Sequence, residues 1–467
     1  MVVKRSIILF FIISFFWSSI VIAKTSWVEN SASLIKELNS AVAGDKIILL
    51  PGQYKLDRFE SKTGGTVNAP ILVSASALDT VVIHASRVET FSIYHPYWIF
   101  ENLVIKGTDK THHALHLSGD ADHIIIRNNK FINFHSHIKS NGRRGQFPDD
   151  VLIVNNYFSN DTLRATSEPT SPIDVVGGHD WIVRSNVVKD FGRLSKKSVS
   201  YGIFLKGHSV NGLIEQNLVI CSQQHNSGYR VGLSLGGGGT GKAYCEQKNC
   251  DYEHRRGTIK NNVVMNCSDA GIYLKKAFDS KVYHNTLINT LGIDAQLMPT
   301  SAVIENNYVG GVIQARKGAV IESNFNMTTA WGWLPYAEKM AQYGIHRISD
   351  YPAKYPSVFK VGQIERLQGW LKWFGRWVAD SRMGLGRDKA ANDFKYFGYG
   401  DLTPITEGLL ITTHRLNSVK KDFWGNLRET DKTYIGAIDL SNSSCDVARK
   451  LMDRLSVPKK LCLDNIW

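Results

Sequence analysis

The chain has 467 residues, of which 43% are hydrophobic, 21% charged and 10% aromatic. This length is sufficient for one long domain or two, and the composition excludes a collagen, a disordered tail and a polytopic membrane protein. Lys and Arg number 55 against 42 Asp and Glu, a net charge of +13. The excess favours an anionic partner, which is a polyanionic substrate, a nucleic acid or a membrane surface.

The N-terminal segment 1–23 has the pattern of a secretory signal. Two basic residues precede an apolar run that ends at Ile22, and Ala23 completes a site for signal peptidase. Cleavage after Ala23 is expected, with an uncleaved anchor as the alternative because the run is long and contains Trp17. The protein is then secreted or periplasmic, with no stable membrane span after cleavage and no nucleic acid as its partner.

Six cysteines in an exported chain suit disulfides. The spacing suggests two pairs, Cys245 with Cys250 and Cys445 with Cys462. Cys221 and Cys267 follow equivalent strands, so they are either stacked free thiols or a bridge between coils. Metal binding is the weaker interpretation, because the sequence has no CxxC motif.

A strand of alternating apolar residues that ends in Asn recurs along the chain, at spacings down to about 20 residues. Its copies are Ile124–Asn129, Leu152–Asn156, Trp181–Asn186, Leu213–Asn217, Thr258–Asn262, Lys281–Asn285, Val303–Asn307 and Val320–Asn324. Asn at a fixed turn position can hydrogen-bond to the same Asn in the next coil. The repeat predicts an all-β fold, a right-handed parallel β-helix over residues 24–329.

A second strand precedes each of these strands. Its copies include Ala114–Gly119, Pro172–Gly177, Gly202–Gly207, Gly232–Gly237, Gly271–Lys276 and Gly292–Leu297. Aliphatic residues of one parity point inward, which leaves two outward columns. The first column is predicted as His116, His137, Asp174, Phe204, Ser234, Tyr273 and Asp294, and the second as Ser118, Lys139, Val176, Lys206, Gly236, Lys275 and Gln296.

Long loops are expected at one edge of this polar, aromatic and basic face. They are the connections 134–150, 159–171, 190–200 and 222–230. The excursion 238–256 leaves the opposite edge, so the two sets of loops could wall a cleft for a chain-like ligand. Beyond the coil, residues 330–400 are predicted to form a Trp-rich, partly helical cover, with sugar stacking or an interfacial helix as alternatives.

Two segments resemble secreted right-handed β-helix polysaccharide lyases, especially the chondroitinase-B and alginate-lyase family. Ala41–Tyr54 with Gly64–Val73 is similar to their opening coil, and Asp422–Arg428 with Ile435–Ala437 is similar to a closing coil of exported β-helix proteins. The resemblance spans roughly residues 30 to 440 and implies a closing coil at 401–440. The spacing of Cys445 and Cys462 predicts a disulfide-linked segment at 441–467. Lyases, epimerases, hydrolases and phage spikes share such coils, so it specifies the fold more than the substrate.

A lyase acting on a uronic-acid polymer needs a cation for the carboxylate, a base for the C5 proton and an acid for the leaving oxygen. The family resemblance implies a lysine base. Lys206 is the predicted base, and Arg230 is the predicted partner of the carboxylate or the leaving group. His208, Tyr273 and Lys275 are the next candidates, for the acid or for substrate binding.

The remaining predicted substrate-binding residues are Arg255, Arg256, Lys139, His179 and Phe204. Lys206 and Lys275 should lie about 10 Å apart, two coils from each other. Asp174 and Asp294 should be about 19 Å apart, too far for the carboxylate pair of a glycoside hydrolase.

No metal site is predicted from the histidines, because His135, His137 and His179 lack ligand spacing. The family's calcium-binding carboxylate pair has no clear counterpart, so no cofactor is certain and Ca²⁺ is left open. Two alternatives to the lyase stand: a uronan C5-epimerase on the same scaffold, and a non-catalytic surface protein that binds anionic glycans. A monomer is expected.

Overall fold

The computed structural model describes residues 23–195, 199–225, 228–237 and 239–328, and short stretches further on: 394–396, 401–404, 411–412, 416, 418–423, 425–428 and 433–437. Segment 1–22, most of the predicted Trp-rich cover and the segment 441–467 with Cys445 and Cys462 lie outside the described residues.

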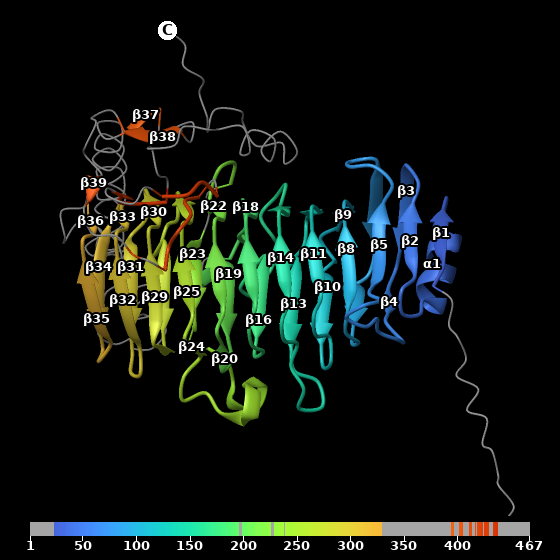
Figure 1. The fold of residues 1–467 in the computed structure, drawn as a ribbon, viewed down its shortest axis with the longest axis horizontal. Coiled ribbons are helices and arrows are strands. Elements are labelled where there is room, and N and C mark those ends of the chain that lie inside the picture. The colour runs from blue at the N-terminus through green and yellow to red at the C-terminus, as the bar shows by residue number, and fades with distance from the viewer. Residues whose placement is uncertain are drawn as a thin grey trace, which may run out of the picture.

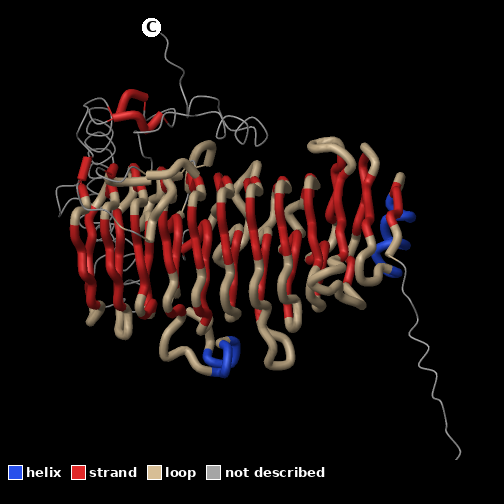
Figure 2. The backbone as a smooth tube through the Cα atoms, viewed as in Figure 1, coloured by secondary structure: helices blue, strands red, loops and turns tan. Residues whose placement is uncertain are grey.

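Residues 25–328 form a right-handed parallel β-helix, as predicted (Figures 1 and 2). Three long parallel sheets, here called sheets A, B and C, form its faces. Sheet A contains β1 (Thr25–Val28), β2 (Lys46–Leu49), β5 (Ile71–Ala75), β8 (Trp98–Glu101), β11 (Ile125–Arg127), β14 (Leu152–Val154), β17 (Ile182–Arg184), β21 (Leu213–Glu215), β25 (Thr258–Lys260), β29 (Ser280–Tyr283), β32 (Ser301–Glu305) and β35 (Val320–Asn324).

Sheet B follows sheet A in each coil after a tight turn. It contains β3 (Gly52–Leu56), β6 (Val81–Ala85), β9 (Val104–Lys106), β12 (Lys130–Ile132), β15 (Tyr157–Ser159), β18 (Val187–Lys189), β22 (Leu218–Ile220), β26 (Val263–Met265), β30 (Thr286–Ile288), β33 (Tyr308–Val309) and β36 (Met327–Thr328). Most of these strands have only three residues, too few for their alternation to stand out in the sequence.

Sheet C carries the second predicted strand of each coil. It contains β4 (Phe59–Glu60), β7 (Glu89–Ile93), β10 (His113–Ser118), β13 (Ile138–Asn141), β16 (Ile173–Val176), β19 (Val199–Lys206), β23 (Tyr229–Leu235), β27 (Ile272–Lys275), β31 (Gly292–Gln296) and β34 (Val312–Arg316). A small parallel sheet, β20 (Ser209–Val210), β24 (His254–Arg255) and β28 (Ala277–Phe278), extends the edge where sheet C turns toward sheet A.

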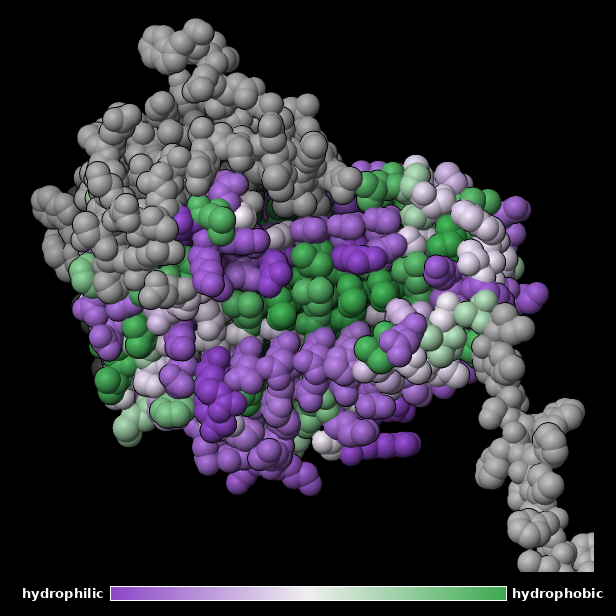
Figure 3. All heavy atoms as spheres, in the orientation of Figure 1, coloured by the Kyte–Doolittle hydropathy of each residue, from purple (hydrophilic) through white to green (hydrophobic). Residues whose placement is uncertain are grey.

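The core is a column of apolar side chains enclosed by the three sheets. Alternate residues of each strand point into it, such as Leu233 and Leu235 of β23, and both are fully buried. On the outer face of sheet A the aliphatic residues Leu72, Ile99, Ile125, Leu152, Ile182 and Leu213 are paired in register on neighbouring strands. This row corresponds to the hydrophobic band over sheet A in Figure 3.

Buried asparagines join the coils at the turn between sheets A and B. Each side-chain amide donates to the side-chain oxygen of the next Asn along the ladder Asn129, Asn156, Asn186, Asn217, Asn262, Asn285, Asn307 and Asn326. The predicted ladder is confirmed except in its last member, where Asn326 replaces Asn324. The strand β35 runs to residue 324, and the turn follows it.

A short helix precedes the first coils. α1 (Ser31–Ser40) begins after Asn30, whose side-chain oxygen accepts the Ser33 amide hydrogen at 3.0 Å. Leu34 and Leu38 on one side of α1 are buried in the same apolar core as the first strands. The helix therefore covers apolar residues at the start of the stack. Among the described residues, no helix is long and apolar enough to cross a membrane.

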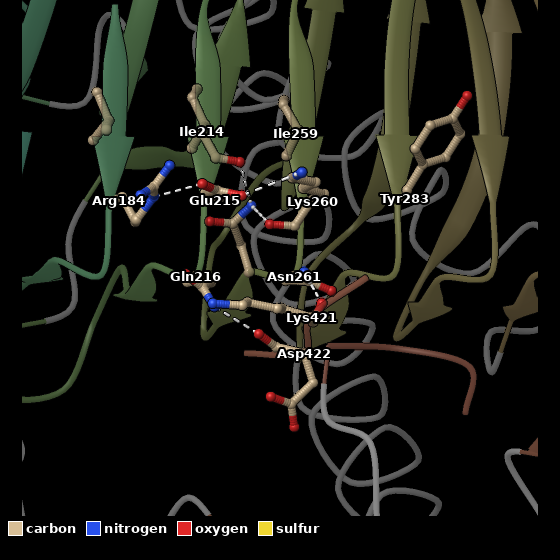
Figure 4. Close-up of polar contacts among 12 residues, drawn as sticks. Arg184, Ile214, Glu215, Gln216, Ile259, Lys260, Asn261, Tyr283, Lys421 and Asp422 are labelled. Carbon is tan, nitrogen blue, oxygen red and sulfur yellow. Dashed lines mark hydrogen bonds and ion pairs between the residues drawn. The ribbon is translucent and has the colours of Figure 1, made fainter. Parts of the chain in front are cut away.

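Beyond residue 328, the described strands form two antiparallel pairs. β39 (Ile411–Thr412) and β40 (Thr433–Tyr434) pair antiparallel with each other, as do β37 (Phe394–Tyr396) and β38 (Asp401–Pro404), and neither pair extends the parallel sheets. The described residues between 418 and 437 lie against the turns between sheets A and B. Here Gln216 and Asn261 donate side-chain hydrogen bonds to the carbonyls of Asp422 and Lys421 (Figure 4).

Candidate functional site

The outer face of sheet C carries the polar columns, but the register of one strand differs from the prediction. In the first column, His116 pairs with Lys139, Lys139 with Asp174, and Asp174 with Phe204. Lys139 therefore belongs to the first column and not to the second, where Asn141 takes its place. A shift of two residues keeps every side chain on the same face, so alternation alone could not reveal it.

His137 was expected on the outer face and instead lies in the core. Its side chain is fully buried between Phe134 and Phe158, and its Nε2 lies 3.1 Å from the Ser159 carbonyl oxygen. Burial lowers the pKa of His137 to about 3, so the ring is neutral. His137 has no place in the candidate site.

Two lysines, Lys139 from the first column and Lys206 from the second, converge on the carboxylate of Asp174 in the first column. The Asp174 carboxylate lies 2.6 Å from the Lys139 Nζ atom and 3.2 Å from the Lys206 Nζ atom. The three residues come from three successive strands, β13, β16 and β19. We call this group the Lys139–Asp174–Lys206 cluster. Two ammonium groups share one carboxylate, so an excess positive charge is available to an anionic ligand.

Burial and charge act in opposite directions within the cluster. Burial raises the pKa of Asp174, but the two lysines outweigh it and hold the pKa well below its ordinary value. Burial lowers the pKa of Lys139; Asp174 opposes this shift, and the like charge of Lys206 adds to it. Asp174 is therefore ionised, and Lys139 loses its proton more readily than an ordinary lysine.

Aromatic rings border the cluster. The Tyr201 and Phe204 rings stack with their centroids 4.0 Å apart, and the Lys206 Nζ atom lies 4.0 Å from the centroid of Phe204. Tyr273 continues the group, with its ring 6.5 Å from that of Tyr201 and its hydroxyl bonded to the Gln296 amide. Burial raises the pKa of both tyrosines. The predicted candidates Phe204, Lys206 and Tyr273 thus lie on one face.

Arg230 does not reach this face. Its side chain is fully buried, and its Nη1 donates to the carbonyls of Cys221 at 2.9 Å and His225 at 2.6 Å. Burial lowers the pKa of Arg230 to about 10. The expected contact with a substrate carboxylate is therefore not supported. The alternation of inward and outward side chains in β23 is interrupted at Gly232, which lies against core side chains. A strict period of two along the strand does not reveal this interruption.

Lys275 and Asp294 lie on the same sheet beyond the cluster. Lys275 is on β27, two strands from β19, as predicted, and burial and then Lys317 lower its pKa. Asp294 is on β31, four strands from Asp174, and its carboxylate accepts a hydrogen bond from Arg316 Nε at 2.8 Å. This separation argues against a hydrolase that would use these two carboxylates.

The other predicted binding residues gather at the edge where sheet C turns toward sheet A. His179 Nε2 lies 3.3 Å from the Glu246 carboxylate, which raises the pKa of His179. The His208 ring packs on Tyr252 at 4.0 Å, and burial lowers its pKa.

Two arginines lie at this same edge. The Arg255 guanidinium is 5.5 Å from the Tyr252 centroid, and Arg256 Nε donates to the Asn211 side chain at 2.9 Å. These residues can contact only a ligand that extends past the loops.

A long loop at this edge projects from the coil. It contains η1 (Lys242–Tyr244) and η2 (Glu246–Lys248), the short helical turns at the bottom of Figure 2, and the Cys245–Cys250 disulfide. The pairing of Cys245 with Cys250 is as predicted. Cys221 and Cys267 also form a disulfide between neighbouring coils, so the alternative of free thiols is wrong.

A histidine–carboxylate pair beside the cluster was not predicted as a site. The Glu89 carboxylate lies 2.8 Å from His116 Nδ1, and the Asn141 side-chain oxygen faces His116 Nε2. Glu89 precedes the repeats that revealed the columns, so no sequence alignment connected it to His116. The sequence feature that could have indicated this pair is His112-His113-Ala114-Leu115-His116, in which three histidines lie on or directly before strand β10.

No group of three or more His, Cys, Asp or Glu side chains is arranged to hold a metal ion in the part of the chain that the structure describes.

Comparisons with known proteins give distant similarities. A family model described as periplasmic copper-binding protein (NosD) matches residues 247–332, less than half of the chain. No curated protein matches the chain.

Several solved structures share the parallel β-helix. An alginate lyase from Paenibacillus sp. str. FPU-7 is 14% identical, with a TM-score of 0.41 over 66% of this chain and 96% of that chain. A rhamnogalacturonan lyase is 13% identical, with a TM-score of 0.44 over 66% and 87%. The A-module of a mannuronan C-5 epimerase from Azotobacter vinelandii is 12% identical, with a TM-score of 0.39 over 65% and 98%. The fold assignment itself rests on the sheets described above.

Proposed function

We propose that this protein is an exported polysaccharide lyase that cleaves a uronic-acid polymer by β-elimination on the outer face of sheet C. The observation that carries the proposal is the Lys139–Asp174–Lys206 cluster beside the stacked rings of Tyr201 and Phe204. Cations bind and neutralise a uronate, and aromatic rings offer a flat surface to a sugar. The finer resemblance to the chondroitinase-B and alginate-lyase family belongs to this proposal.

The roles within the cluster follow from its geometry. Lys206 lies over the Phe204 ring at the border of the aromatic group and serves to neutralise the uronate carboxylate. Lys139 has the lowered pKa and, in its neutral amine form, takes the C5 proton. Asp174 holds both lysines in place. This assignment moves the base from Lys206, as expected from sequence, to its neighbour on the same carboxylate.

Epimerisation at C5 is the second candidate, because it begins with the same proton abstraction. The two reactions differ in the fate of the carbanion, which either expels the O4 oxygen or takes a proton from the opposite face. Export is part of the proposal. The two disulfides suit an oxidising compartment, and the N-terminal segment has the pattern of a secretory signal.

The test is the ultraviolet absorbance of unsaturated uronate during incubation with a panel of uronic-acid polymers, with and without calcium. We expect Lys139→Ala and Lys206→Ala each to lower the rate by about 100-fold or more, which is the usual contribution of such groups. Lys106→Ala, at an exposed lysine of β9 in sheet B, is the matched control and should leave the rate unchanged. Tight retention of a glycan without any chemical change would instead indicate a binding protein.

A further inference from the structure

The hydrogen bonds around His116 define its protonation state. Its Nδ1 faces the Glu89 carboxylate at 2.8 Å, and its Nε2 faces the Asn141 side-chain oxygen. The Asn141 amide nitrogen donates to the Gly142 carbonyl at 3.1 Å, which orients the amide so that its oxygen meets the ring. Both ring nitrogens thus face acceptors, and only the doubly protonated imidazolium satisfies both.

Glu89 places a negative charge beside the His116 ring. Glu89 on β7 also accepts from Ser92 at 2.6 Å and from Arg58 at 3.2 Å, and its hydrogen bond with His116 helps to lower its pKa to about 2. Glu89 is therefore ionised throughout the neutral range. Lys139 on β13 and the His113 ring, 5.4 Å away on β10, also lie near His116 and are titratable.

His113 adds no second positive charge beside this imidazolium. Its Nδ1 lies 3.1 Å from the Ser136 carbonyl oxygen, and burial lowers its pKa to about 3. Of the two neighbouring rings, only His116 is placed to carry two N–H groups, one facing Glu89 and the other facing Asn141.

The order of the three groups across the strands of sheet C matches the order of the reacting atoms. Lys206, Lys139 and His116 follow one another from β19 toward β10. In a uronate, the C6 carboxylate, the C5 proton and the O4 oxygen follow one another in the same way. With the carboxylate at Lys206 and C5 at Lys139, the O4 oxygen lies toward His116.

We propose that His116 is the general acid that protonates the leaving O4 oxygen, and that Glu89 is its positioning residue. The inference rests on the proposed function and extends it. Lys139 takes the C5 proton, the C5 electron pair forms the C4–C5 double bond, and the C4–O4 bond breaks. The O4 oxygen takes the proton of His116 Nε2 in place of Asn141. His116 is left neutral and keeps its Nδ1 proton, which it donates in the hydrogen bond to Glu89. Water then restores the Nε2 proton and accepts the proton that Lys139 took from C5.

The test separates proton abstraction from cleavage in deuterium oxide. In His116→Gln, Lys139 still removes the C5 proton, but without an acid the carbanion returns to uronate and takes up deuterium. We expect cleavage to fall about 100-fold or more while C5 exchange persists. His84→Gln, at an exposed histidine of β6 (Val81–Ala85) in sheet B, is the matched control and should retain both activities.

Two outcomes would overturn the acid role. One is cleavage by His116→Gln at the wild-type rate. The other is a parallel loss of exchange and cleavage in a variant that unfolds like the wild type. A wild type that neither cleaves a uronan nor exchanges its C5 proton would refute the proposed function itself, and the acid role with it.

The positioning role of Glu89 has its own readout, which also serves if His116→Gln does not fold. Glu89→Gln should lower cleavage more than C5 exchange in deuterium oxide, because the His116 ring loses the carboxylate that orients it. Removal of a residue with a structural role alone would lower exchange and cleavage together. A parallel loss of both, in a variant that unfolds like the wild type, would therefore contradict the role.

Discussion

At the scale of single residues, Asp174 decides the charge of the outer face of sheet C. Its carboxylate binds Lys139 and Lys206, whose side chains are only 19% and 17% exposed. Without this carboxylate, two poorly solvated ammonium groups would repel each other. Asp174 is thus needed for the fold of the face as well as for the orientation of the proposed base.

Asp174→Asn should destabilise the protein at neutral pH and less so in acid. The pKa of Asp174 is lowered on folding, so its contribution to stability is present above the ordinary aspartate pKa of about 4 and declines as the pH falls toward the lower folded value. Urea unfolding at pH 7 should show a loss of about 3 kcal/mol, as for other broken buried pairs. The difference from the wild type should shrink at about pH 3. A difference independent of pH would contradict the assignment.

Single residues also mark the limit of the sequence analysis of the site. Alternation placed Phe204, Lys206 and Tyr273 on one outward face, because these strands keep a strict period of two. It misplaced His137 by two residues along a strand and missed the reversal of parity that buries Arg230. The first error concerns the register between strands and the second a local break in the alternation of β23, and a hydrophobic pattern encodes neither.

At the scale of elements, the asparagine ladder fixes the turn between sheets A and B. Asn217, for example, is fully buried and donates to the carbonyls of Val183 and Glu215 as well as to Asn262. Its side-chain oxygen accepts from the main chain and side chain of Asn186. One side chain therefore satisfies buried groups in three successive coils.

Asn217→Ala should lower the free energy of unfolding by about 2–4 kcal/mol, because it leaves several buried polar groups without partners. Asn326→Ala, at the last described rung of the same ladder, is the matched comparison. Asn326 is partly exposed, so water can replace the lost bonds and the cost should be smaller. Chemical denaturation measures both, and equal losses would contradict a special role for the interior rungs.

The two disulfides should differ in their contribution to stability. Cys221–Cys267 closes a separation of 46 residues between neighbouring coils, and Cys245–Cys250 closes one of only 5 within a loop. Loop-closure entropy assigns about 4 kcal/mol to the first bridge and about 2 kcal/mol to the second. Thermal unfolding of the two double Cys→Ser variants should therefore show the larger loss for the inter-coil pair. The reverse order would show that the constraint on the unfolded chain is not the main effect.

At the scale of the whole molecule, the parallel β-helix could be predicted because each coil repeats the same local pattern. The docking of the described residues between 418 and 437 could not be predicted, since it depends on contacts across more than 150 residues of sequence, such as Arg428 with Asn261 at 2.9 Å. The Arg428 guanidinium also donates to the Gly436 and Ala437 carbonyls. These residues are thus hydrogen-bonded to one another and to three coils of the β-helix.

Arg428→Ala should release this segment and leave the coils folded. The change removes buried hydrogen bonds on both sides of the contact, while the sheets keep their own ladders. Limited proteolysis followed by mass spectrometry should show faster cleavage within 418–437 and an unchanged pattern over 25–328. Simultaneous cleavage of both parts would show that the segment is required for the coil.

The central claim is that the outer face of sheet C removes the C5 proton of a uronic-acid polymer. Proton magnetic resonance of such polymers, incubated with the protein in deuterium oxide, tests it most directly. We predict loss of the C5 proton signal together with a new vinylic H4 signal, both abolished by Lys139→Ala and unaffected by Lys106→Ala. Loss of the C5 signal without the vinylic one would identify the epimerase. An unchanged spectrum across the panel would contradict the claim.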